Sequence, residues 1–235
     1  MLRRQFHQAS AALSLGALLL LTHQRARALS LGDLTNADAA SGVKAALGQG
    51  AQAAMALLGR PDGFLGNPQV RIGLPGTLDD AAKVMKSLGQ GRRVDELVTA
   101  INRAAEAAVP LGKDLLVRAV QTMTVTDAKN ILTGGNTSVT TFFAEKTRTP
   151  LSERFRPVVN QSIEKVGLAQ KYNSFASKAA GFGLLRPEEA DLGHYVTGKT
   201  LDGLYFMIGE EEKKIREDPL SAGAAIAKKV FGALK

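Results

Sequence analysis

The chain has 235 residues, with 30 Lys and Arg against 22 Asp and Glu, three His, and neither Cys nor Trp. The lack of cysteine argues against a disulfide, a thiolate metal site or a lipid anchor on cysteine. The composition is rich in Ala, Leu, Lys and Glu and poor in strand-favouring residues, so we expect an all-α fold.

Residues 1–28 have the three parts of a secretory signal peptide. Arg3 and Arg4 form a basic start, a mostly apolar run extends from Ala9 to Leu21, and a small-x-small cleavage site ends at Ala28. The apolar run is shorter than the roughly 20 residues that span a bilayer. We therefore expect a periplasmic protein that does not span the membrane, exported by the twin-arginine route, which the sequence "RRQF" resembles, or by the general route.

Residues 29–235 are expected to form one compact multi-helix domain. Thr77 and Thr124 each precede an acid by three residues, Asp80 and Asp127, in a looser form of the capping box that starts a helix. The second of these helices should run to Thr133. Prolines suited to first turns, where proline loses no helical hydrogen bond, occur at four further positions: Pro110, Pro150, Pro187 and Pro219.

Two segments depart from regular helix. Residues 59–75, "GRPDGFLGNPQVRIGLP", are rich in Gly and Pro around a short Val-Arg-Ile run, which predicts an irregular loop or a small β-hairpin. Pro157 has no N–H to bond to the carbonyl of Glu153, so we expect either a bend or a new helix there.

Apolar residues recur at helical spacing from Leu192 onward and predict a long amphipathic helix. The further members of this stripe are Val196, Leu201, Leu204, Ile208 and Ile215. The charged run from Glu210 to Lys214 is then expected to be a solvated face.

The stretch from Asn130 to Phe143, "NILTGGNTSVTTFF", has glycines and hydroxyls like those of a phosphate-binding loop. We favour a corner between two helices, in which Gly134 adopts the left-handed conformation and Asn136 or Thr137 caps the next helix. No lysine follows the glycines as it would in a phosphate loop, although the first N–H groups of the new helix could hold an anion.

Few residues are suited to catalysis. His194 is the only histidine after the signal, and without a G-x-S-x-G motif a capping or surface role is favoured over a Ser-His-Asp triad. No pattern indicates a metal or a cofactor, and no spacing singles out a pair of carboxylates. Asn102, Arg103 and Glu106 share one helical face, as either a buried polar network or a ligand site.

The basic excess is concentrated in one segment. Residues 146–186 carry 8 basic and 2 acidic side chains, whereas residues 187–235 carry 7 and 9. Within this segment Arg148, Arg154 and Arg156 are candidates for an anion site, because guanidinium suits bidentate contact with phosphate or carboxylate. The alternative is that acids elsewhere in the chain pair with them.

Six segments together resemble the bacterial domain of unknown function 4197. They are "LTNADAASGVKAALGQG" from Leu34, "GRPDGFLGNPQVRIGLP" from Gly59, "VDELVTAINRAAEAAVP" from Val94, "MTVTDAKNILTGG" from Met123, "ERFRPVVNQSIEKVGL" from Glu153 and "YVTGKTLDGLYFMIGEEEKKIREDP" from Tyr195. The resemblance implies an exported helical protein and carries over no catalytic residue.

Three classes of function follow from these features. The first is a non-enzymatic envelope protein that binds an anionic or amphiphilic partner, such as anionic lipid, an envelope polymer or an acidic protein, and not nucleic acid. The second is a lipid-type carrier with an apolar cavity. The third is a carboxylate-dependent hydrolase.

Replacing Arg3 and Arg4 together by Lys should stop export by the twin-arginine route, because an ammonium cannot reproduce the planar guanidinium donors. The measurement is the fraction of processed protein in the periplasm, with Arg60→Lys in the mature chain as the control. Export of the double variant at the normal rate would assign the signal to the general route.

Overall fold

The computed structural model describes residues 36–135, 137–167, 169–173, 177 and 191–218. The predicted signal peptide lies outside these residues. The described helices are α1 (Asn36–Leu58), α2 (Gly76–Ser87), α3 (Gly91–Ala108), α4 (Lys113–Gln121), α5 (Val125–Thr133), α6 (Ser138–Ile163) and α9 (Leu192–Glu217), with a 3-10 turn, η2 (Val109–Gly112), between α3 and α4. No strand occurs in this part of the chain, so the all-α prediction is confirmed.

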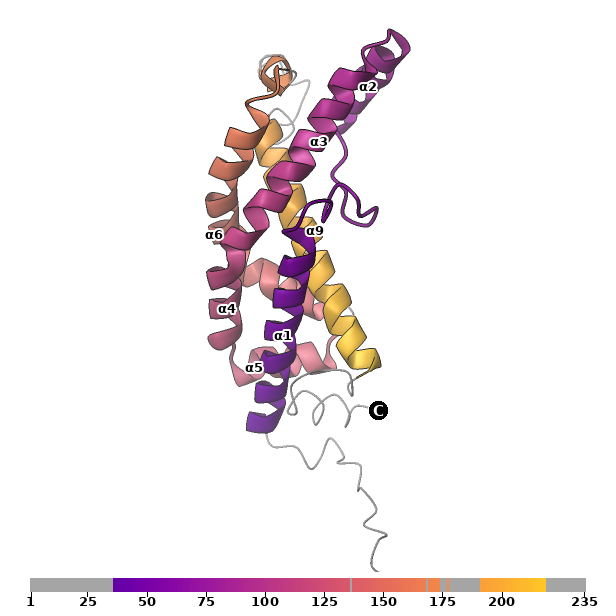
Figure 1. Ribbon diagram of the computed structural model, residues 1–235. Helices are drawn as coiled ribbons and strands as arrows, with labels where there is room; N and C mark the ends of the chain where they lie inside the picture. The colour runs from indigo at the N-terminus through magenta and orange to yellow at the C-terminus, as the bar shows by residue number, and fades with distance from the viewer. Residues whose placement is uncertain (1–35, 136, 168, 174–176, 178–190, 219–235) are drawn as a thin grey trace, which may run out of the picture.

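The helices form an elongated bundle (Figure 1). Helix α9 packs against α6 and α1, and α6 also packs against α3. The α2–α3 hairpin forms the upper end of the view and α5 lies near the lower end. Among the described helices, none combines the length and the apolar content needed to cross a bilayer.

The core lies where α6 and α9 meet, and the apolar stripe predicted for α9 is buried as expected. Leu192, Val196 and Leu204 have no exposed surface. From α6, Leu151 and Phe155 belong to the same core cluster and are equally buried. Each fully buried side chain of this size contributes about 1.5–3 kcal/mol to stability.

The charged run from Glu210 to Lys214 is not wholly a solvated face, contrary to expectation. Glu212 is buried, with 3% of its surface exposed. The helical period explains this, because Glu212 lies four residues after Ile208 and three before Ile215, on the face that packs into the bundle. Glu211 pairs with Lys214 at 2.6 Å near the surface.

The two predicted capping boxes have different outcomes. Thr124 and Asp127 form a complete capping box: the Thr124 hydroxyl accepts from the Asp127 N–H at 3.0 Å, and the Asp127 carboxylate accepts from the Thr124 N–H at 2.9 Å. The backbone hydrogen bond from Thr124 holds the pKa of Asp127 below its usual value. A helix also begins near Thr77, as predicted, but the capping residue differs: α2 starts at Gly76, its N-cap is Pro75, and the Pro75 carbonyl accepts its first N–H bonds.

The prolines also have mixed outcomes. Pro110 lies in the first turn of η2, as predicted. Pro150 and Pro157 both lie inside the continuous helix α6, so the predicted helix starts at these positions are wrong. An interior proline costs about 3 kcal/mol, and the apolar face of α6 buried against α9 offsets that cost. The bend at Pro157 stays a prediction, and Pro187 and Pro219 lie outside the described residues.

The stretch from Asn130 to Phe143 is a corner between α5 and α6, as favoured. Gly134 is extended, with φ −77° and ψ 160°, so the expected left-handed conformation is wrong. Glycine is required there for close approach, since a Cβ would lie 2.5 Å from the Asn130 carbonyl oxygen. Thr137 precedes α6 without capping it through its side chain, and Asn136 lies outside the described residues.

Replacing Thr124 by Ala should lower the free energy of unfolding by about 1 kcal/mol, because it removes the N-cap acceptor of α5. Urea unfolding followed by circular dichroism measures the change. Thr126→Ala, in the first turn of the same helix, is the matched control, since its exposed side chain forms no hydrogen bond with a described residue and its loss should be smaller. Equal losses for the two variants would contradict the assignment of the cap.

Candidate functional site

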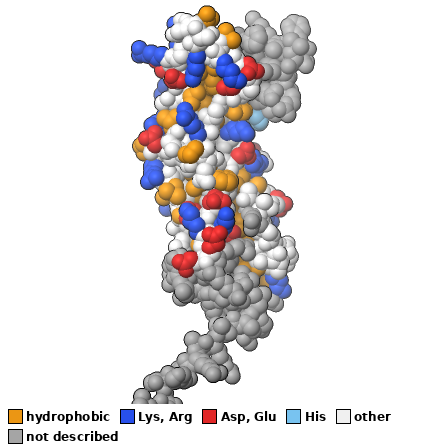
Figure 2. Space-filling model, turned by 90° about the vertical axis from the view of Figure 1, so that its right-hand side faces the viewer, with side chains coloured by type: hydrophobic (Ala, Val, Ile, Leu, Met, Phe, Trp, Pro, Cys, Tyr) orange, Lys and Arg blue, Asp and Glu red, His pale blue; other side chains and the backbone are white. Residues whose placement is uncertain are grey.

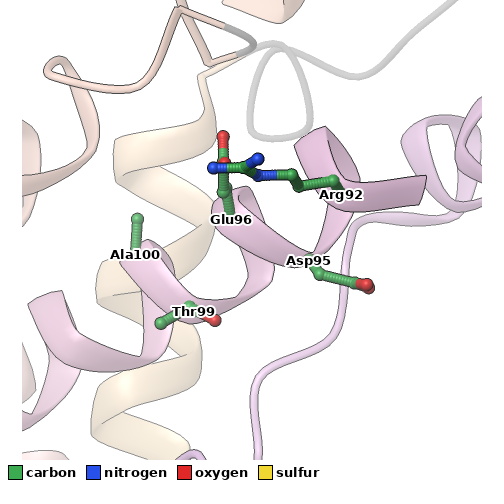
Figure 3. A pocket seen from close by; sticks show the side chains of 5 residues that line it. All are labelled: Arg92, Asp95, Glu96, Thr99 and Ala100. Carbon is green, nitrogen blue, oxygen red and sulfur yellow. The ribbon is translucent and has the colours of Figure 1, made fainter. Parts of the chain in front are cut away.

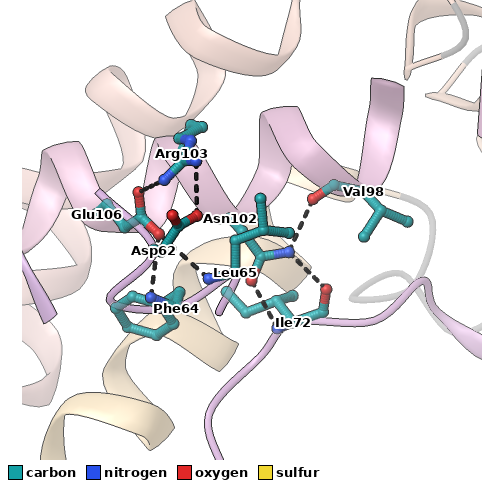
Figure 4. Close-up of polar contacts among 8 residues, drawn as sticks. All are labelled: Asp62, Phe64, Leu65, Ile72, Val98, Asn102, Arg103 and Glu106. Atoms are coloured by element: carbon teal, nitrogen blue, oxygen red, sulfur yellow. Dashed lines mark hydrogen bonds and ion pairs between the residues drawn. The ribbon is translucent and has the colours of Figure 1, made fainter. Parts of the chain in front are cut away.

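The loop between α1 and α2, residues 59–75, is held on α3 by the buried side chain of Asn102 (Figure 4). The Asn102 Oδ1 atom accepts from the Ile72 N–H at 2.8 Å, and the Asn102 Nδ2 atom donates to the Ile72 carbonyl at 2.9 Å and to the Val98 carbonyl at 2.8 Å. The side-chain amide thus satisfies both backbone groups of Ile72, which have no sheet partner.

A second anchor lies one turn further along α3. The buried Glu106 Oε1 atom accepts from the N–H groups of Phe64 and Leu65, at 3.0 and 3.2 Å. Its Oε2 atom accepts from Arg103 at 2.6 Å, and Arg103 also donates to Asp62 at 2.7 Å. The hydrogen bonds to Glu106 and Asp62 raise the pKa of the Arg103 guanidinium above its usual value, and the bond to Glu106 has the larger effect. A buried carboxylate with three donors is compensated for its lost hydration.

The same loop lies against α9. A Cβ at Gly203 would come within 2.9 Å of the Phe64 ring and 3.3 Å of Val70, so only glycine allows this approach. The Tyr195 hydroxyl donates to the Gly73 carbonyl at 3.2 Å. Burial raises the pKa of the Tyr195 hydroxyl. Residues from α3 and α9 therefore fix the backbone of the loop from both sides.

A groove of about 530 Å³ lies between this loop and the outer face of α9. Its volume is within the range of about 300–1,000 Å³ typical of small-molecule sites. The side chains that give the groove its chemistry are Gln69, Arg71, Tyr195, Lys199, Asp202 and Phe206.

The groove has an excess of positive charge. Arg71 and Lys199 are exposed and form no ion pair with any described residue. Lys199 lies 5.9 Å from the centre of the Tyr195 ring, in a cation–π contact. The acid of the groove, Asp202, accepts from Arg148 at 2.7 Å. The two unpaired cations are thus available to an anionic ligand.

Phe206 borders both this groove and a second hollow of about 400 Å³ between α6 and α9. The Phe206 side chain is 40% exposed and lines both hollows, as does Asp202. Within the second hollow the Arg148 guanidinium lies 5.3 Å from the centre of the Tyr205 ring. An apolar ring between two hollows can contact the hydrocarbon part of a ligand.

The structure does not bring the three arginine candidates together. Arg148 pairs with Asp202, and Arg156 donates to Asp191 at 2.6 Å, so acids of the C-terminal segment do pair with the basic segment. Arg154 donates to the Leu111 carbonyl in η2 at 3.1 Å. Acids elsewhere in the chain therefore pair with Arg148 and Arg156, which was the alternative to an anion site, and the partners of the three guanidinium groups lie in different parts of the bundle.

A larger hollow, of about 590 Å³, runs along the surface of α3 (Figure 3). Its charged side chains already have partners: Arg92 pairs with Glu96 at 3.1 Å, and Asp95 pairs with Lys86 of α2 at 3.2 Å. Figure 3 shows Arg92 extending over Glu96 while Asp95 points away from both. The charges are balanced, so we assign no ligand to this hollow.

His194 is exposed in the first turn of α9, and its backbone N–H donates to the capping carboxylate of Asp191 at 3.1 Å. The described residues contain no group of three or more His, Cys, Asp and Glu side chains placed to hold a metal ion.

Arg71, Lys199 and Phe206 were not identified from the sequence. One signal was available for Phe206, because it lies between Leu204 and Ile208 and so falls off the apolar stripe of α9. An aromatic residue on the polar face of an amphipathic helix is a candidate contact residue. No comparable signal marks Arg71, whose role depends on how the loop meets α9.

Replacing Asn102 by Ala should lower the free energy of unfolding by about 3 kcal/mol, because the buried N–H and C=O of Ile72 lose their partners. Asn67→Ala is the control in the same loop, since the Asn67 Oδ1 atom accepts the exposed Gln69 N–H and its Nδ2 atom makes only a long contact, 3.9 Å, with the Met207 sulfur, so the change should cost less than about 1 kcal/mol. Urea unfolding measures both, and equal costs would contradict the anchoring role of Asn102.

A family model described as "Protein of unknown function (DUF4197)" matches residues 33–232. No match was found among curated proteins or among solved structures. The match covers all of the helices described above, and the chain belongs to the DUF4197 family.

Proposed function

We propose that the chain is an exported, non-enzymatic envelope protein that binds an anionic amphiphile in the groove beside α9. The observation that carries this proposal is the pair of unpaired cations, Arg71 and Lys199, in one groove with the exposed ring of Phe206. The pattern of a signal peptide in residues 1–28 supports export to the periplasm.

Each part of the groove suits one part of such a ligand. The Arg71 guanidinium offers paired donors to a carboxylate or phosphate, and the Lys199 ammonium adds a second positive charge. Phe206 offers an apolar face next to them. The groove wall is fixed before binding by the anchors of the loop, which reduces the entropy lost when a ligand binds.

The groove supports binding more than hydrolysis. A carboxylate-dependent hydrolase needs two acids around the reacting bond. The lining of the groove includes one acid, Asp202, and that acid is engaged by Arg148 at 2.7 Å. A lipid carrier would hold the apolar tail of its ligand in an internal cavity. The groove is open, which favours a tail that lies along the surface.

The proposal predicts that Arg71→Gln with Lys199→Gln weakens binding of a fluorescent fatty acid, used below its micelle concentration. Loss of two charged contacts should raise the Kd by at least about tenfold, more at low salt than at high salt. Phe206→Ala should raise the Kd by about tenfold through lost apolar contact.

The matched control is Arg118→Gln with Lys129→Gln, which removes the same charge from exposed positions on α4 and α5. This control should leave the Kd within about twofold of the wild type. A wild type that does not bind the probe, or an equal loss in the control, would overturn the proposal.

A further inference from the structure

The groove and the second hollow lie along one face of α9. Phe206 and Asp202 line both of them, so the two hollows adjoin at these side chains. Residues three or four positions apart share one side of a helix. The lining residues of α9 follow this spacing through both hollows: Tyr195, Lys199, Asp202, Phe206, Gly209 and Lys213. A ligand bound along this face can therefore contact both hollows.

The walls of the two hollows differ in polarity. The wall of the groove is divided about evenly between polar and apolar surface, whereas the wall of the second hollow is mostly apolar. Figure 2 views the molecule from the side on which the loop and the lower part of α9 lie in Figure 1, and it shows apolar side chains between the charged ones along the bundle. An amphiphile requires this arrangement, because its head group needs a polar wall and its tail an apolar one.

The charges of the two hollows give such a ligand a direction. The groove offers the unpaired cations Arg71 and Lys199. The second hollow is lined by more acids than bases, which are Asp202, Glu210 and Glu212 against Arg148 and Lys213. Glu210 forms no ion pair with a described residue, and a free carboxylate repels an anionic head group. The head is therefore favoured in the groove and the tail in the second hollow.

The length of this face is sufficient for a long acyl chain. Lys199 and Gly209 are about 15 Å apart along α9, at a rise of about 1.5 Å per residue. Gly209 lies opposite α6, since a Cβ there would come within 3.0 Å of the Thr140 Oγ1 atom. Because Gly209 has no side chain, the second hollow stays open at this level. An extended chain with its head at Lys199 can thus pass Phe206 and enter the second hollow.

We propose that the ligand of the groove is a long single-chain amphiphile, whose anionic head is bound by Arg71 and Lys199 and whose acyl tail crosses Phe206 into the second hollow between α6 and α9. This inference rests on the proposed function and deepens it, because it assigns a class to the ligand and a site to its tail. Short anions leave the second hollow empty and bind more weakly.

The first test measures how the Kd depends on the length of the acyl chain. The probes are octanoate, dodecanoate and hexadecanoate, which displace a fluorescent fatty acid and are used below their micelle concentrations. Each CH₂ that is buried in the second hollow should lower the Kd by about fourfold. The Kd should therefore fall from octanoate, which is too short to fill the hollow, to hexadecanoate.

A charge placed in the second hollow should remove this gain. Thr140→Asp should raise the Kd of hexadecanoate by at least about tenfold, while the Kd of octanoate stays within about twofold of the wild type. Thr141→Asp is the matched control, because it adds the same charge at the next residue of α6, which is exposed and does not line the hollow. It should leave both Kd values within about twofold.

The second test locates the two ends of the bound ligand and uses the absence of Trp from the chain. Gln69→Trp places a single indole at the groove, and Lys213→Trp places one at the second hollow. Hexadecanoate brominated near its methyl end should quench Lys213→Trp more strongly, and hexadecanoate brominated near its carboxylate should quench Gln69→Trp more strongly. Val125→Trp, at an exposed position on α5, is the control and should be quenched by neither.

The outcomes separate this inference from the function on which it rests. A wild type that binds none of the probes would overturn both. Binding of octanoate and hexadecanoate with the same Kd would overturn the site of the tail and leave the groove as an anion site. So would a methyl-end bromine that does not quench Lys213→Trp, and this second test leaves Thr140 unchanged, so it holds even where Thr140→Asp fails to fold.

Discussion

The structure depends on one constraint, which is that backbone groups of the loop over residues 59–75 must find hydrogen-bond partners without a sheet. Asn102 and Glu106 meet this requirement from a single face of α3. An unpartnered buried N–H or C=O costs about 1–3 kcal/mol, so the two side chains decide where the loop can lie. Once it is held there, Gly203 allows the loop to contact α9, and the groove follows from that contact.

Helix α9 serves two purposes through its two faces. The inner face carries the apolar stripe, in which residues such as Val196 and Leu204 are fully buried against α6 and α1. The outer face carries Lys199, Asp202 and Phe206, which line the groove. The packing that stabilises the bundle therefore also fixes the positions of the groove side chains, and rigid elements position a site more accurately than loops do.

Residue patterns within a single helix correctly predicted the features that depend on short-range interactions. The capping box at Thr124, the buried stripe from Leu192 and the shared face of Asn102 and Glu106 all depend on spacing along one helix. Tertiary packing decided the features that were predicted wrongly. Pro150 lies within α6 because the helix is held by its neighbours, and Glu212 is buried because the bundle covers the next position of the stripe.

The groove could not be predicted for a related reason. Arg71 and Lys199 are far apart in the sequence, and what brings them together is the position of a loop that has no regular structure. The charge of their segment makes Arg148 and Arg156 anion candidates, whereas the acids that pair with them lie in α9 and at its N-cap. Charge counted along the chain does not show which cations remain unpaired after folding.

Glu106 and Asn102 hold the loop at two places, near Leu65 and at Ile72. The segment between Leu65 and Ile72 is tied at both ends to α3, and it carries Arg71 over the groove. The length of this segment therefore affects the width of the groove independently of the helices, since residues added to or removed from it alter the loop wall while both anchors stay in place. The helices keep one wall of the groove in place, and this short span alone sets the shape and charge of the other wall.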